Sequence, residues 1–145
     1  MGLEDNKAIA RRYFGDLWNA KRPEVIDEIA RPDCVIHLAP GQAHRPPNLH
    51  VWFEHALVAF PDVQFTVLDL FAEGDRVGVR WEYIATHTGE FLGLPATGKR
   101  VTDTGINIFR IETGKIAEFW LVQDSLGLLQ QLGMIERKSM GGHPA

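Results

Sequence analysis

Hydrophobic residues recur at helical spacing over the first sixty positions and predict three amphipathic helices. The first covers residues 3–19, and its wide aromatic face is made by Ile9, Tyr13, Phe14, Leu17 and Trp18. A short second helix is expected to begin at Pro23 and to end before Arg31, because Pro32 disfavours helix at the residue before it. The third covers residues 49–60 and is stopped by Pro61.

Beyond Pro61 the periodicity changes to strands separated by glycine-containing turns. The strand-like runs are residues 63–74, 75–89, 100–114 and 115–123, which should form an antiparallel meander. A shorter β-rich run, "CVIHL", lies at residues 34–38, before a Pro/Gly loop. Residues 90–99, "EFLGLPATGK", are too long for a tight hairpin and are expected to form a lid. A last short helix is predicted over residues 125–133.

Helices followed by a long curved antiparallel sheet predict an α+β fold, in which the helices pack on one face of the sheet. Alternation along residues 81–87 places Trp81, Tyr83 and His87 on the same face. If Thr113 and Gly114 form the next hairpin loop, the register places Asn107 opposite Trp120. Asn107, Trp120 and Asp124 are then expected to share one surface with His87, although a slip of one residue would reverse this.

Length, net charge and cysteine count limit the classes of protein to which this chain could belong. The chain has 145 residues, which predicts one domain over residues 1–135 and a flexible tail over residues 136–145. The net charge of −4 and the absence of a basic stripe exclude nucleic acid as an expected partner. Cys34 is the single cysteine, and no signal peptide or membrane span is evident, so a soluble cytoplasmic protein is expected.

The segment "ATHTGEFLGLPATGKRVTDTGINIFRIETGKIAEFWLVQDSLGLLQQLG", with "ARRYFGDLWN" and "RPDCVIHLAP" upstream, resembles the SnoaL-like polyketide cyclases of the nuclear-transport-factor-2-like superfamily. The resemblance covers most of residues 7–133. It implies N-terminal helices packed on a strongly curved antiparallel sheet that forms a conical pocket, a fold also described as cystatin-like. It further implies a homodimer and no metal or organic cofactor.

The resemblance also implies site residues. Asp124 matches the aspartate that acts as acid and base in an intramolecular aldol ring closure of a polyketide ester, and His87 matches a cavity residue. Asn107 stands where characterised cyclases carry a histidine, so the resemblance to their substrate site does not extend to this position. The expected chemistry is removal of a proton by Asp124, with His87 and Asn107 as hydrogen-bond donors to the developing oxyanion. The expected substrate is an apolar or aromatic small molecule.

Other interpretations remain open at this point. Asp124 is also a good helix N-cap. In a non-catalytic binding or dimerisation module, capping the helix would be its whole role. The chemical interpretation therefore requires Asp124 to project into the mouth of the pocket.

Several other side chains also have two interpretations. His37 is either a cavity residue or a satisfied core histidine, and Trp81, Tyr83 and Trp120 either pack the core or stack on a flat ligand. An isomerase or epoxide hydrolase is the third function, suggested only by Asp103 with Arg80. The histidines near residues 37–55 lack the spacing of a metal site.

Overall fold

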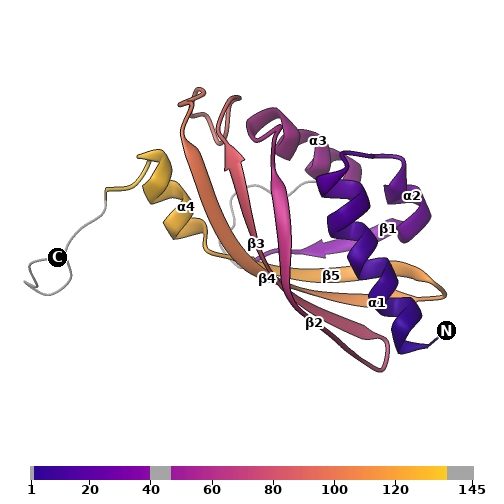
Figure 1. The fold of residues 1–145 in the computed structure, drawn as a ribbon. Coiled ribbons are helices and arrows are strands. Elements are labelled where there is room, and N and C mark those ends of the chain that lie inside the picture. Colours follow the sequence, from indigo (N-terminus) through magenta and orange to yellow (C-terminus); the bar gives the residue numbers. More distant parts are fainter. Residues whose placement is uncertain (1, 40–46, 137–145) are drawn as a thin grey trace, which may run out of the picture.

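The computed structural model describes residues 2–39 and 47–136, so most of the predicted tail and part of the Pro/Gly loop lie outside the described residues. Within these ranges the chain forms helices packed against a five-stranded sheet of order β1-β5-β4-β3-β2 (Figure 1). The elements are α1 (Leu3–Arg12), η1 (Tyr13–Asn19), α2 (Val25–Ile29), β1 (Ala30–His37), α3 (Leu49–Ala59), β2 (Gln64–Glu73), β3 (Arg76–Thr86), β4 (Arg100–Glu112), β5 (Lys115–Gln123) and α4 (Ser125–Leu132). The α+β class predicted from the sequence is confirmed.

The first predicted helix has two parts. After α1 the chain widens into the π-helical segment η1, with backbone bonds from Ala20 N–H to Gly15 C=O at 3.0 Å and from Arg22 N–H to Leu17 C=O at 3.2 Å. The wider turn suits the run of aromatic residues, because residues four and five apart then lie on one face. Tyr13, Phe14, Leu17 and Trp18 are all buried as a result.

The meander from β2 to β5 is antiparallel throughout, as predicted, and its tight turns fall at Gly74 and at Thr113-Gly114. One part of the prediction is wrong: β1 pairs with β5 in parallel, so the sheet is mixed. The strand also begins earlier than expected, at Ala30, and includes Pro32. Proline is tolerated there because β1 is an edge strand and its pairing with β5 is interrupted between Ala30 and Val35.

A β-bulge in β5 changes the register that the sequence predicted. Ile111 pairs with Ile116 as expected, but Arg110 pairs with Glu118, so Ala117 is an extra residue in β5. Ile116 and Ala117 are consecutive and both buried, whereas a regular strand would turn one of them outwards. The bulge shifts every later residue by one position, and Asn107 therefore pairs with Leu121 instead of Trp120.

Residues 87–99, which join β3 to β4, are held at both ends by backbone bonds. His87 N–H donates to Lys99 C=O and Gly98 N–H donates to His87 C=O, each at 2.8 Å. Gly89 packs so closely on the end of α3 that an added Cβ would lie 1.8 Å from the Val58 carbonyl oxygen. These contacts fix the direction in which the predicted lid leaves the sheet.

A glycine in β4 is required by the packing of an aromatic ring on the inner face of the sheet. A Cβ at Gly105 would lie 2.5 Å from Trp81 Cζ2 and 2.7 Å from the Val122 carbonyl oxygen. We expect Gly105→Ala to destabilise the protein by about 1–3 kcal/mol, because neither the strand nor the ring can move freely. Urea unfolding followed by circular dichroism measures the change.

Gly15 is the matched control for that substitution. Nothing lies within 4 Å of an added Cβ at Gly15, and it is in a helical segment. Gly15→Ala should therefore leave stability unchanged or raise it by up to about 1 kcal/mol. Equal stability of Gly105→Ala and the wild type would contradict the packing described for this wall.

Candidate functional site

A cavity of about 540 Å³ lies between the inner face of the sheet, the helices that cover it and the loop before β4. Its volume is typical of a small-molecule site. The wall is largely aromatic, and the rings are those of Tyr13, Phe14, Trp18, Trp52, Phe60, Phe65, Trp81, Tyr83 and Phe91. The segment predicted to form a lid contributes its tip, residues 90–93, to the lining of the cavity.

Trp81 and Tyr83 form the sheet side of this wall. They are two residues apart on β3, and their rings stack with centroids 5.8 Å apart and planes 10° apart. Phe65 of β2 meets both rings edge-on, at 5.1 Å and 5.3 Å. This arrangement fixes the predicted residues Trp81 and Tyr83 side by side in the wall of the cavity.

Asn107 supplies the polar group of the wall with the best-defined orientation. It is 2% exposed, and its Oδ1 accepts a hydrogen bond of 2.8 Å from Trp81 Nε1. An indole nitrogen can only donate, so the amide oxygen must face Trp81 and the NH₂ group must face the other way. Tyr13 lies next to this amide, and burial raises the pKa of its hydroxyl. Both groups therefore offer hydrogens.

Asp124 does not line the cavity, although its neighbours Gln123 and Leu128 do. Its side chain is exposed at the start of α4, where Oδ1 accepts a hydrogen bond of 2.9 Å from Gly127 N–H. The expectation that Asp124 projects into the pocket is thus wrong for this conformation, because the unpaired amides at the helix start hold the carboxylate. The carboxylate therefore lies outside the lining of the cavity.

His87 lies behind the wall instead of on its surface. It is 0% exposed, and the centroid of its ring lies 5.6 Å from that of Phe60. Its Nδ1 accepts a hydrogen bond of 3.2 Å from Thr97 N–H. Because Nδ1 is an acceptor, the proton belongs on Nε2, which is buried without a hydrogen-bond partner. His87 shares the inner face with Trp81 and Tyr83 as predicted, but Phe60 separates it from that pair.

His37 and Trp120 lie on the outer face of the sheet, so their expected place in the cavity is wrong. The bulge at Ala117 turns Trp120 outwards opposite Ile108. There its ring stacks on His37 at 4.9 Å, and His37 Nε2 bonds to Glu118 Oε1 at 2.9 Å. Leu121 takes the inner position that was predicted for Trp120.

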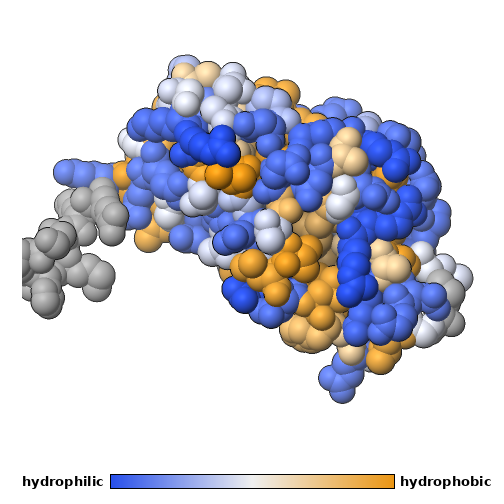
Figure 2. Space-filling model, viewed as in Figure 1, coloured by the Kyte–Doolittle hydropathy of each residue, from blue (hydrophilic) through white to orange (hydrophobic). Residues whose placement is uncertain are grey.

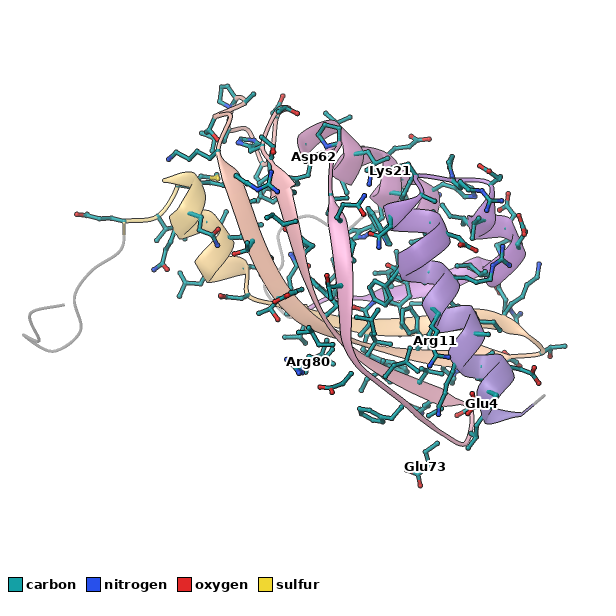
Figure 3. The ribbon with its side chains drawn as sticks, viewed as in Figure 1. Glu4, Arg11, Lys21, Asp62, Glu73 and Arg80 are labelled. Carbon is teal, nitrogen blue, oxygen red and sulfur yellow. The ribbon has the colours of Figure 1, made fainter. Side chains whose placement is uncertain are left out.

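Asp103 is a buried acid that the sequence did not single out as a cavity residue. It is 6% exposed on the inner face of β4, directly opposite Tyr83. Arg80 is on the other face, bonded to Asp69 at 2.6 Å, and Figure 3 shows Arg80 pointing away from the helices. The pairing of Asp103 with Arg80, which would have suggested an epoxide hydrolase, is therefore absent. The available signal was its place in the alternation with Gly105 and Asn107.

In the part of the chain that the structure describes, no three side chains of His, Cys, Asp or Glu are grouped as metal ligands would be. Of the histidines near residues 37–55, His44 lies outside the described residues. His50 bonds to Asp27 at 2.9 Å, and His55 lines the cavity. No helix within the described ranges has the length and apolar character needed to cross a membrane.

Comparisons with known proteins agree with this geometry. A family model described as SnoaL-like polyketide cyclase matches residues 8–132. Aklanonic acid methyl ester cyclase DnrD of Streptomyces peucetius is 27% identical over 116 residues, which are 74% of this chain and 79% of DnrD.

Two solved structures are also similar. AclR of Streptomyces galilaeus, for which hydroxylase activity has been proposed, has a TM-score of 0.84 at 31% identity and covers 96% of this chain and 87% of its own. IdmH of Streptomyces antibioticus, proposed to be a polyketide cyclase, has a TM-score of 0.73 at 34% identity and covers 90% of this chain and 99% of its own.

Trp81 and Trp120 lie on opposite faces of the sheet, so substituting each of them tests the site. We expect Trp81→Leu to weaken binding of fluorene, a planar hydrocarbon, severalfold, because a stacking contact of about 1 kcal/mol is lost. Trp120→Leu should leave the affinity unchanged, since Trp120 faces away from the cavity. Fluorene fluorescence titrations measure both. Equal losses in the two variants would show that fluorene binds elsewhere.

Proposed function

Because this chain belongs to the SnoaL-like polyketide cyclase family, we propose that it closes a ring in a planar, carbonyl-rich small molecule held in the aromatic cavity. The observation that carries the proposal is the buried amide of Asn107, whose NH₂ group is oriented by Trp81 at the wall of a largely apolar space. An apolar cavity with a few fixed donors suits a substrate whose negative charge appears only during the reaction.

The proposed reaction is an intramolecular aldol addition without a cofactor. A base removes a proton from a carbon that lies between two carbonyl groups, and the resulting enolate carbon attacks a second carbonyl of the same molecule. One carbon–carbon bond forms, the carbonyl oxygen becomes an alkoxide, and a proton returns to it. The product is an isomer of the substrate. The cavity brings the two reacting ends together, and the donors of Asn107 and Tyr13 stabilise the oxyanion.

Asp124 is our candidate for the base, by its match to the family's acid/base aspartate. Its carboxylate caps α4, so it must leave Gly127 N–H and rotate towards the cavity mouth before it can act. The cost is modest, because losing an N-cap interaction typically costs about 1 kcal/mol. Capping and catalysis are therefore compatible as two rotamers of one side chain. His87 would act only through a movement of Phe60.

A change at Asp124 tests the proposal. Asp124→Asn keeps a good N-cap but cannot accept a proton from carbon. With aklanonic acid methyl ester, the substrate named for DnrD, or with a panel of β-keto esters, we expect the rate of cyclisation to fall about a hundredfold or more. Liquid chromatography with mass spectrometry follows the product, which has the mass of the substrate.

Asp69→Asn is the matched control, because Asp69 is an acid of the outer face. It should turn over at the wild-type rate. Full activity in Asp124→Asn would contradict the role of Asp124, and a wild type that binds these compounds without turnover would favour the non-catalytic binding module. A product heavier by one oxygen atom would instead indicate a hydroxylase, as proposed for AclR.

We further propose that the outer face of the sheet is the interface of a homodimer. Four exposed apolar side chains, together with the half-buried Trp120, form one patch across β2, β4 and β5; the four are Phe71, Ile106, Ile108 and Val122. Phe71 is 66% exposed and Val122 is 63% exposed. Figure 2 shows hydrophobic surface on the stretch between α1 and α4. A patch of this kind on an otherwise charged surface favours self-association, and a second copy presents the same patch.

Phe71→Glu tests this interface, because it would place two carboxylates in the apolar contact of a symmetric pair. We expect the mass in solution, measured by light scattering after gel filtration, to change from that of a dimer to that of a monomer. Leu3→Glu is the control, since Leu3 is an exposed leucine of α1 and lies outside the patch. A monomeric wild type would contradict the proposal.

A further inference from the structure

The carboxyl group of Asp103 is held in an unusual position at the back of the cavity wall. Oδ1 accepts a hydrogen bond of 2.7 Å from the N–H of Thr104, and Oδ2 is buried without a partner of standard geometry. Among the described residues no lysine, arginine or histidine forms an ion pair with it. A buried carboxylate without a cation is costly, so loss of the proton is less favourable at this position than in water.

Tyr83 connects this buried acid to the cavity. It is the cross-strand partner of Asp103, and its side chain lines the cavity wall. The pKa of the Tyr83 hydroxyl is raised, first by burial and then by the charge of Asp103 and by hydrogen bonding to it, so the hydroxyl stays protonated. A tyrosine hydroxyl has one hydrogen to donate. That hydrogen points either towards Asp103 or towards the cavity.

We propose that Asp103 is a positioning residue that sets the direction of the Tyr83 hydroxyl. While Asp103 is protonated, its O–H donates to the Tyr83 oxygen, and Tyr83 donates its own hydrogen to a carbonyl oxygen of the ligand. When Asp103 loses its proton, the carboxylate accepts the Tyr83 hydrogen, and the tyrosine turns its lone pairs to the cavity. A carbonyl oxygen is then repelled where it was bound before.

The surroundings of Asp103 support a change of protonation close to neutral pH. Burial, the largest cause, raises its pKa to about 6, and the nearby charge of Asp124 raises it as well. Hydrogen bonds from the backbone of Thr104 and Asp124 and from the Tyr83 side chain oppose the shift. These groups belong to β3, to β4 and to the junction of β5 with α4. The α4 sequence, SLGLLQQL, contains no ionisable side chain. No cation from these elements offsets the effect of burial.

This inference deepens the proposed function and rests on it for its biological meaning. A donor that appears only while Asp103 is protonated would select substrates with a carbonyl beside Tyr83 and would stabilise the enolate oxygen formed there. The selection requires no movement of the backbone. The protonation state of Asp103, which does not itself line the cavity, would decide whether Tyr83 presents a hydrogen-bond donor or an acceptor to the ligand.

Fluorenone and fluorene form a matched pair of probes, because they share one planar skeleton, differ by one carbonyl oxygen and do not titrate. Binding to the full chain is followed by quenching of tryptophan fluorescence. From about pH 5 to about pH 8, we expect the wild-type affinity for fluorenone to fall about fivefold, the effect of one hydrogen bond, while the affinity for fluorene stays constant. In Asp103→Asn both affinities should be independent of pH, since an amide does not titrate.

Two further readouts separate this role from a purely structural one. Tyr83→Phe should abolish the pH dependence and weaken fluorenone binding at low pH alone. The melting temperature of the wild type relative to Asp103→Asn should fall as pH rises from about 4 to about 6, because an acid with a raised pKa stabilises the fold only while protonated. A pH-dependent affinity that persists in Asp103→Asn would overturn the proposal, as would constant affinity in the wild type.

The binding assay requires no turnover, so the two proposals can fail separately. A wild type that cyclises β-keto esters but binds fluorenone equally at all pH values keeps the proposed function and loses the role of Asp103. A pH-dependent fluorenone affinity without turnover of any substrate has the opposite meaning.

Discussion

The structure depends on an aromatic lining that is packed at its base and open at its centre. Phe109 and Phe119 of the sheet are fully buried against Tyr13, with ring centroids 4.9 Å and 5.6 Å away. Above this base the aromatic rings contact one another along the wall but do not fill the centre, so a cavity of about 540 Å³ remains. An empty apolar space loses dispersion contacts. A molecule that filled this cavity would make the contacts that the rings do not make with one another.

The same apolar lining makes each polar group within it consequential. In water the hydrogen bond from Trp81 Nε1 to Asn107 Oδ1 would compete with hydrogen bonds to solvent. At this apolar wall it fixes the orientation of the amide, which could otherwise rotate by half a turn. Desolvation also acts on Asp103, whose pKa is raised to about 6, whereas Asp124 remains in solvent at the start of α4. Two carboxylates close together thus differ in what they can do. Burial raises the pKa of Asp103, whereas the exposed carboxylate of Asp124 is held by a hydrogen bond from Gly127 N–H.

Much of this architecture could be predicted from the sequence, because helical periodicity, alternation and turn residues act locally. The helices, the meander and the inner face of β3 follow from such patterns. The register error in β5 has one source, the bulge at Ala117, which no turn residue announces and which moves Trp120 to the outer face. His37 lies beside Trp120 through the pairing of β1 with β5. The pairing partner of β1 depends on contacts far apart in the chain. Whether Asp124 caps a helix or faces a cavity depends on a rotamer, which sequence patterns do not specify.

The inner face of β4 suggests why Asn107 replaces the histidine that the family resemblance leads one to expect. A histidine would change its charge near neutral pH, whereas an asparagine keeps its donors at every pH. Asp103, four residues away on the same face of β4, is then the residue whose charge changes with pH. Gly105 between them leaves room for the Trp81 ring, which an added Cβ would meet at 2.5 Å. One aromatic ring therefore orients the constant donor and separates it from the group that titrates.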